Sequence, residues 1–320
     1  MKCVNQKQKG MKFSLRYKRM LSLCLASLFF CVGCATEPIR VLLVTGQNNH
    51  NWQVSHEVLR SVIEQSDLFT VDYAITPPKG GDMSVFRPDF SAYDVVLLDY
   101  NGDRWSEQTD RAFLEYVDNG GGVVIYHAAD NAFAGWDAFN RIIALGGWEG
   151  RNEQSGPYVY WVGDRLVRDT TAGPGGSHGA QREYPVNCRN TKHPITRGLP
   201  EVWMHAQDEL YDRMRGPGNI DALLYTGYAD PARGGSGREE PLVFTVDYGK
   251  ARILHLMLGH IGGENTPDFC PAVACVGFQT LLLRGLEWAA TGKVKQKVPA
   301  DFPSADRSVV RPIRPSSDNR

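Results

Sequence analysis

Short apolar runs alternate with amphipathic segments along the first half of the chain. The runs are rich in β-branched residues, as is typical of strands that are buried on both faces of a sheet. They span residues 39–45, 69–74, 94–99 and 123–126. Three of them are followed by segments with apolar residues three and four positions apart, at 54–63, 106–117 and 137–145. This alternation predicts an α/β fold with right-handed βαβ units and a doubly wound parallel sheet.

The second half of the chain has a different pattern. From 146 to 222 it is rich in aromatic residues and glycine and lacks a helical period, so we expect an insertion that decorates one sheet, not a second domain. Residues 276–290 predict a closing helix, with Gly292 as its stop. Three further runs predict strands that return to the sheet, at 223–228, 241–247 and 251–256.

The first 33 residues have the layout of a bacterial signal peptide. A basic region precedes an apolar run, 21–31, that is too short to span a bilayer by itself. The run ends in Cys31-Val-Gly-Cys34, which resembles a lipobox, although the position of Cys31 usually carries leucine. This pattern favours a lipoprotein with an acylated, palmitate-bearing Cys34. The alternative is an ordinary secretory signal that is cleaved near Ala35.

The rest of the chain divides into a linker at 34–38, one domain at 39–297 and a flexible tail at 298–320. The tail is rich in proline, serine and charge, which favours an extended or disordered segment. No later apolar run reaches about 18 residues, so we expect the lipid on Cys34 to be the anchor. The predicted location is the membrane of the bacterial cell envelope, facing the periplasm or the surface.

Charge and cysteine content narrow the function classes. The formal net charge of −1 argues against a nucleic-acid partner, because phosphate binding needs a basic face. Three cysteines follow the lipobox, at Cys188, Cys270 and Cys275. Cys270 and Cys275 are near enough in sequence to form a disulfide in an exported protein. The alternative, that they are small buried apolar residues, stays open.

Histidines follow several of the predicted strands. Gly120-Gly-Gly-Val-Val-Ile-Tyr-His127-Ala-Ala has the strand–turn–helix layout of a nucleophile elbow, with an imidazole in the nucleophile's place. His50 follows the first strand and His260 follows the last one. The carboxyl ends of parallel strands share one edge of a sheet, so we expect His50, His127 and His260 to meet in one crevice.

Other polar and aromatic residues are candidates for closing over that crevice and binding a ligand. Each also has a structural alternative, such as capping, packing or a backbone hydrogen bond. His255 lies inside an apolar run and is expected to be a core histidine, and His56 and His193 are expected to be structural or solvated. The substrate-binding candidates are Asn49, Trp52, Asp130, Arg151, His178, His205, Asp208, Glu209 and Tyr211.

Several motifs together resemble the ThuA-like (trehalose utilisation) family, over about residues 39–303. They are Gly46-Gln-Asn-Asn-His-Asn-Trp52, the elbow with His127, Gly175-Gly-Ser-His-Gly179, His193-Pro-Ile-Thr-Arg-Gly-Leu199, Asp208-Glu-Leu-Tyr211, Leu258-Gly-His260 and Arg284-Gly-Leu-Glu-Trp-Ala-Ala-Thr-Gly292. The resemblance implies a flavodoxin-like fold of the class I glutamine amidotransferase-like type. It also implies a role in the use of trehalose and related disaccharides, in pathways that pass through 3-keto-sugars.

The resemblance also bears on which reaction is possible at His127. The elbow cysteine of true amidotransferases falls at this position, and without a thiolate no glutamyl thioester can form, so glutamine hydrolysis is excluded. We expect an enzyme of isomerase, lyase or glycoside hydrolase type on 3-keto-sugars, with His127, His260 and His50 in acid–base roles. The same three histidines are candidate ligands of zinc or manganese. The alternative is a lipid-anchored carbohydrate-binding protein that performs no chemistry.

Overall fold

The computed structural model describes Met1 and residues 37–313. Apart from Met1, the predicted signal peptide, its lipobox and Cys34 lie outside the described residues, as does the end of the tail. From Pro38 onward the chain forms one compact unit. None of the helices described is both long and apolar enough to cross a membrane.

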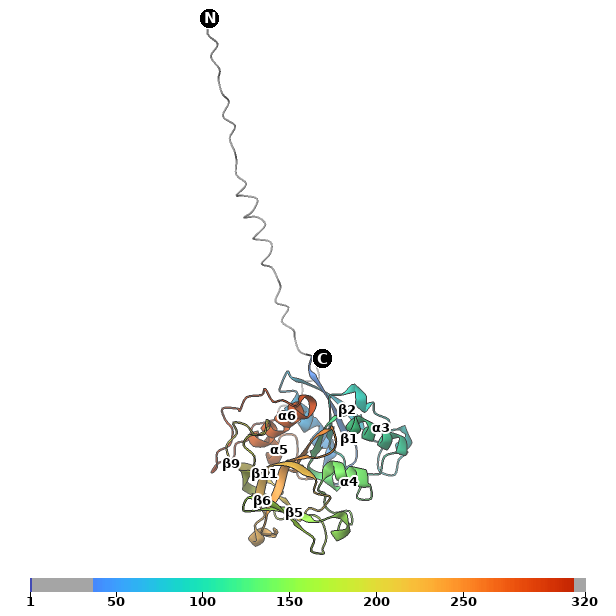
Figure 1. The fold of residues 1–320 in the computed structure, drawn as a ribbon, viewed down its shortest axis with the longest axis vertical. Coiled ribbons are helices and arrows are strands. Elements are labelled where there is room, and N and C mark those ends of the chain that lie inside the picture. Colours follow the sequence, from blue (N-terminus) through green and yellow to red (C-terminus); the bar gives the residue numbers. More distant parts are fainter. Residues whose placement is uncertain (2–36, 314–320) are drawn as a thin grey trace. The chain divides into compact units, whose positions relative to one another are not determined.

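A mixed, mostly parallel sheet forms the centre of the molecule, with helices around it (Figure 1). Five strands are parallel, and in spatial order they are β2 (Phe69–Ile75), β1 (Ile39–Thr45), β3 (Val95–Leu98), β4 (Gly122–Tyr126) and β13 (Arg252–Leu256). Antiparallel strands continue the sheet from β13, in the order β12 (Glu239–Val246), β11 (Ile220–Tyr228), β8 (Arg182–Cys188) and β9 (Val202–Asp208). The predicted α/β, flavodoxin-like fold is confirmed, and its parallel part has the order of a doubly wound sheet.

The predicted insertion adds strands to the sheet. Strands β8 and β9 extend it beyond β11, while β5 (Tyr158–Val162) pairs with β12 and with β6 (Arg165–Asp169). A separate two-stranded ladder joins β7 (Ser177–His178) to β10 (Tyr211–Asp212). Strands β5 and β6 are neighbours in sequence, but the pairings of β5 with β12, β8 with β11 and β7 with β10 join distant segments. The local pattern of residues carried no signal for these distant pairings.

Helices cover both faces of the parallel strands. On one face, α2 (Trp52–Ile63) and α6 (Val276–Thr291) pack apolar residues such as Leu59 and Leu282 against Val41 and Val124. On the other face, α3 (Glu107–Asp118) and α4 (Asp137–Ile143) pack against alternate strand residues such as Val123. Because successive strand side chains point to opposite faces, each buried strand supplies both layers of the core. A short helix, α5 (Pro271–Ala274), precedes α6.

The ends of several elements follow the predicted signals. Ser106 caps α3 by accepting a hydrogen bond from the backbone N–H of Thr109, and Gly292 ends α6 with a left-handed backbone (φ 72°). In the tail, Val310 forms a β-bridge with Cys275, and Ser304 accepts a hydrogen bond from the N–H of Met204. Residues 298–313 therefore lie against the domain as extended chain. Cys188, Cys270 and Cys275 are free thiols.

Gly122 lets α6 approach β4 closely. A Cβ atom at this buried position would lie 2.5 Å from the carbonyl oxygen of Ala289 and 3.0 Å from that of Asp94. We expect Gly122→Ala to lower the free energy of unfolding by about 1–3 kcal/mol, because neither backbone can move without disturbing the core. Urea denaturation measures the change. The control is Gly135→Ala, where an added Cβ meets no atom within 4 Å. Equal midpoints for both variants would contradict this packing argument.

Candidate functional site

Three histidines and one glutamate meet at the edge formed by the carboxyl ends of the parallel strands. The Nδ1 atom of His260 is 3.2 Å from Oε2 of Glu209 and 3.4 Å from Nε2 of His127. The same Glu209 oxygen is 3.9 Å from Nε2 of both His50 and His127. We call these four residues the histidine–glutamate cluster. His50, His127 and His260 thus come together, in the arrangement predicted from the sequence.

The loop after β1 carries His50, and a buried carboxylate on the next strand holds this loop in place. Asp99 follows β3 and accepts hydrogen bonds from the side chains of Asn48 (3.3 Å), Thr45 (3.3 Å) and Ser55. The side-chain oxygen of Asn48 in turn accepts one from the N–H of His50 (3.0 Å). Asp99 therefore fixes the loop without touching the cluster, a role that the sequence analysis missed.

The turn after β4 carries His127 in a strained conformation. Its φ is +42°, which is uncommon for a residue other than glycine and is typical of nucleophile elbows. The Nδ1 atom lies 2.6 Å from the carbonyl oxygen of Met257, so it carries the proton and leaves the Nε2 lone pair facing the cluster. The Tyr211 ring stacks on the imidazole, with its hydroxyl 3.0 Å from Nε2. The elbow thus presents one defined nitrogen to the site.

Asp208, at the end of β9, joins the two remaining segments of the cluster. Its carboxylate accepts hydrogen bonds from the backbone N–H groups of Glu209 (2.7 Å), Gly259 (2.7 Å) and His260 (3.0 Å). It also pairs with Nε2 of His205 at 2.7 Å. Glu209 and His260 are thereby placed side by side although they are far apart in sequence.

The charges in the cluster follow from burial and from contacts within it. Burial, followed by the neighbouring His50, lowers the pKa of His127 to about 3, so this imidazole is neutral. Burial also acts against charge on Glu209 and His260. Their mutual hydrogen bond outweighs it, since the pKa of Glu209 is lowered and that of His260 is raised. These shifts favour positive charge on His260, beside the Glu209 carboxylate, over positive charge on His127.

A pocket of about 350 Å³ opens above the cluster. His178 and Asn49 lie in its wall, where the sequence analysis expected ligand contacts. Asn131 also faces it, and its Oδ1 atom is buried with no hydrogen-bond partner among the described residues. The lining residues are Asn49, His50, Asn131, Trp148, His178, Gln181, Glu209, Tyr211, His260, Gly262, Gly263 and Glu264. Asn131, Gln181 and Glu264 were not predicted. Asn131 lies in the turn after β4, beside the predicted Asp130, and the other two stand in no recognisable motif.

Four predicted ligand contacts lie behind the pocket wall. His205 and Asp208 are buried and paired with each other; Cys275 and Asp208 raise the pKa of His205 to about 10 although burial opposes it. Asp130 is fully buried and pairs with His255, the predicted core histidine, at 3.2 Å. Arg151 is 3% exposed and donates to the carbonyl oxygens of Asn131, Ala132 and Gly147. These four residues support the site from beneath it.

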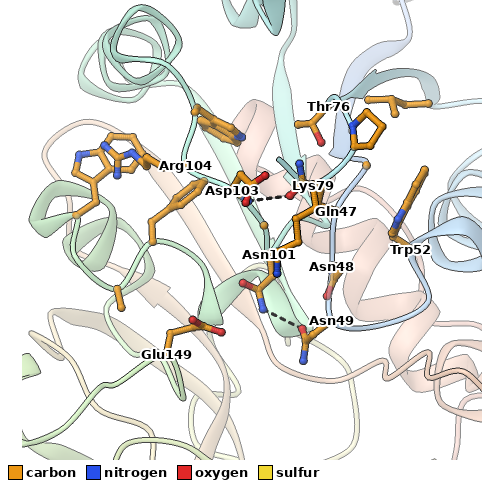
Figure 2. Close-up of a pocket in the computed structure, with 18 of the residues that line it drawn as sticks. Gln47, Asn48, Asn49, Trp52, Thr76, Lys79, Asn101, Asp103, Arg104 and Glu149 are labelled. Carbon is orange, nitrogen blue, oxygen red and sulfur yellow. Dashed lines mark hydrogen bonds between the residues drawn. The ribbon is translucent and has the colours of Figure 1, made fainter. Parts of the chain in front are cut away.

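Trp52 lies in a second hollow, the outer groove, of about 1230 Å³ (Figure 2). The outer groove adjoins the cluster pocket, because Asn49 lines both. Asn49 accepts a hydrogen bond from Asn101 there (Figure 2). Arg104 in its wall is already paired with Asp110 at 2.6 Å. The groove is larger, but the convergent titratable groups are in the cluster pocket, so the smaller space is the candidate functional site.

Fold and site together define a flavodoxin-like α/β protein with histidine in the elbow position. The chain belongs to the ThuA family, described as trehalose utilisation, whose family model matches residues 40–289. No curated protein matches the sequence.

Solved structures agree with this membership. The chain is 65% identical to a putative ThuA-like protein from Parabacteroides merdae ATCC 43184, with a TM-score of 0.85. That match covers 86% of this chain and 98% of the other. A putative ThuA-like protein from Bacteroides uniformis ATCC 8492 is 20% identical, with a TM-score of 0.50, over 82% of this chain and 95% of the other. The second match shows a shared fold.

Asp99 gives the site a pH-dependent support. Burial raises its pKa to about 7, whereas the pKa of an aspartate in an unfolded chain is about 3.9. Between these pH values the unfolded chain releases the proton and the folded chain keeps it. Wild-type stability should therefore fall, relative to Asp99→Asn, as pH rises from about 4 to 7, by roughly 2–4 kcal/mol in total. Urea unfolding of both proteins across this range measures the difference. A stability difference that does not change with pH would contradict the raised pKa.

Proposed function

We propose that the protein is an enzyme of disaccharide utilisation that acts on a 3-keto-sugar in the cluster pocket. The observation that carries the proposal is the convergence of three imidazoles and Glu209 at the base of a small polar pocket. Four separate segments supply these groups, so the arrangement depends on the whole fold. Membership of the trehalose utilisation family supports carbohydrate as the substrate class.

The pocket has the size and lining that suit one sugar ring. Its volume is at the lower end of the usual range for small-molecule sites. The rings of Trp148 and Tyr211 meet edge to face at 4.8 Å and form an apolar wall. The unpartnered oxygen of Asn131 is an acceptor for a sugar hydroxyl, and Gln181 adds a second polar side chain. A ring with one apolar face and several hydroxyls satisfies all of these groups.

The proposed chemistry is proton transfer next to the keto group. A carbonyl at C3 acidifies the neighbouring C–H bonds, and removal of a proton places negative charge on the carbonyl oxygen. Negative charge on that oxygen calls for a positive group at the cluster, which protonated His260 or a cation held there would supply. His178 lies in the pocket wall with its Nδ1 atom 2.9 Å from the carbonyl oxygen of Gly179, and its exposed ring suits it to take the proton. The enolate then leads to epimerisation or elimination.

This assignment differs from the acid–base roles predicted for His127 and His260. Each of these rings has one nitrogen facing the cluster. The other nitrogen faces an outer acceptor, which is the carbonyl oxygen of Met257 for His127 and the Glu264 carboxylate for His260. Rings held in this way are poorly placed to carry protons to and from solvent. We therefore propose that His178 moves the proton and that protonated His260, or a cation held by the cluster, polarises the carbonyl oxygen.

The His178→Gln variant tests the enzyme assignment. Incubation with 3-keto-disaccharides, followed by mass spectrometry, should show turnover in the wild-type protein and a loss on the order of 10²-fold in the variant. Calorimetry should show that sugar binding survives. The control is His56→Gln, because His56 bonds Trp52 O on α2 and lies outside the pocket. If wild-type protein binds sugars but yields no product from any of them, the protein is a non-catalytic carbohydrate-binding protein.

We also propose that the protein is anchored in the cell envelope through lipidated Cys34. The support is the sequence: a basic region, a short apolar run and Cys31-Val-Gly-Cys34. Cys34→Ala should abolish incorporation of labelled palmitate and move the protein from the membrane fraction to the soluble fraction. Cys24→Ala, inside the apolar run, is the matched control and should leave both unchanged. Palmitate labelling that persists in Cys34→Ala would refute the anchor.

A further inference from the structure

The histidine–glutamate cluster has the geometry of a metal site. We infer that His50, His127, His260 and Glu209 bind one divalent first-row transition ion, such as zinc or manganese. The four ligand atoms all lie within 4.8 Å of one another. Ligands at about 2.1 Å from one ion are roughly 3.0 Å apart at a right angle and about 3.4 Å apart at the tetrahedral angle. The contacts of 3.2 and 3.4 Å already match these separations, and the two contacts of 3.9 Å need to contract by about 0.5 Å to reach the tetrahedral value.

The outer nitrogen of every histidine in the cluster faces an acceptor. Nδ1 of His127 is 2.6 Å from Met257 O, and Nδ1 of His50 is 3.1 Å from Oδ1 of Asn49. Nε2 of His260 is 3.5 Å from Oε1 of Glu264. An acceptor on the outer nitrogen draws the proton there and leaves the inner lone pair free to bind a metal. Three such pairs around one point are the usual outer arrangement of metal-binding histidines.

A bound cation accounts for the close approach of the four inner atoms better than shared protons do. With the outer nitrogens protonated, three inner lone pairs and one carboxylate oxygen face each other. One proton, shared between His260 and Glu209, satisfies the closest of these contacts, and the Tyr211 hydroxyl donates to Nε2 of His127. The inner nitrogen of His50, 3.9 Å from Glu209, receives neither proton. A divalent ion is attracted to all four atoms at once and balances the carboxylate charge. Mixed imidazole and carboxylate donors favour a transition ion over magnesium or calcium.

The ion would be reachable from the pocket. His50, Glu209 and His260 all line it, so a position on the ion faces the space assigned to the sugar. Four protein ligands leave room for a substrate oxygen in a five-coordinate shell. The ion would thus supply the polarising charge that the proposed reaction needs at the carbonyl oxygen. The metal inference does not rest on the proposed reaction, since it follows from the four ligands alone.

His178 provides a matched comparison within the same pocket. Its Nδ1 atom is 3.8 Å from Oε1 of Glu209, the other oxygen of that carboxylate. The ring is exposed and also contacts the carbonyl oxygen of Gly179, so we place His178 outside the ligand set. Loss of this ring should leave the ion in place.

Metal analysis of the purified full-length chain tests the inference. The protein is stripped with a chelator, dialysed against zinc or manganese and measured by inductively coupled plasma mass spectrometry. We expect about one ion per wild-type chain and at least a ~10-fold loss in His260→Ala and in the isosteric Glu209→Gln, because each removes a ligand. His178→Ala should keep the wild-type metal content. Circular dichroism confirms that each variant is folded.

The outcomes separate this inference from the proposed reaction. Wild-type protein that binds neither ion, or folded ligand variants that keep a full complement, would overturn the metal site whatever the activity. A stoichiometric ion that Glu209→Gln loses supports the site even if no sugar is converted. Added metal should also raise the thermal midpoint of stripped wild-type protein but not that of Glu209→Gln.

Discussion

One buried carboxylate, Asp208, holds together the two halves of the site. Its oxygens accept the N–H groups of Glu209, Gly259 and His260, and His205 pairs with it from behind. Removing one partner from such a buried network costs several kcal/mol, because the remaining polar groups have no water to replace it. The contact between Glu209 and His260 therefore depends on a residue that does not touch the pocket.

The same principle recurs under each segment that carries a cluster residue. Asp99 supports the loop of His50, and Asp130 pairs with His255 beneath the elbow of His127. Each of these carboxylates is almost completely buried and hydrogen-bonded. A layer of polar residues thus lies between the apolar core and the cluster. We interpret this layer as the reason why imidazoles from separate strands keep fixed orientations.

The sequence predicted the parallel half of the fold and the meeting of three histidines, since both follow from local patterns. Apolar runs identify buried strands, and the carboxyl ends of such strands share an edge, so His50, His127 and His260 had to converge. Glu209 was only one of many polar candidates, because β9 reaches the site through antiparallel pairings that leave no periodic signal. Arg151, His205 and Asp208 looked like ligand contacts, yet they bind backbone or each other. The sequence alone does not distinguish a polar residue that lines the pocket from a buried one that supports the pocket wall.

The chain belongs to the trehalose utilisation family, and the cluster is the candidate site for the chemistry that we propose. A flavodoxin-like fold of this type can hold a cysteine in its elbow, and here the elbow presents a neutral imidazole to two others and a carboxylate. On the metal-site inference, the elbow supplies a metal ligand in place of a nucleophile. This interpretation links the strained backbone of His127 to metal binding, because the strain orients one nitrogen toward a shared point.

Anomalous diffraction from crystals grown with manganese or zinc shows whether the cluster binds an ion. We expect one strong peak at the absorption edge, between the inner atoms of His50, His127, His260 and Glu209 and about 2.1 Å from each. The metal site would be contradicted if no peak appeared at that point, including the case in which peaks appeared only at other places on the protein.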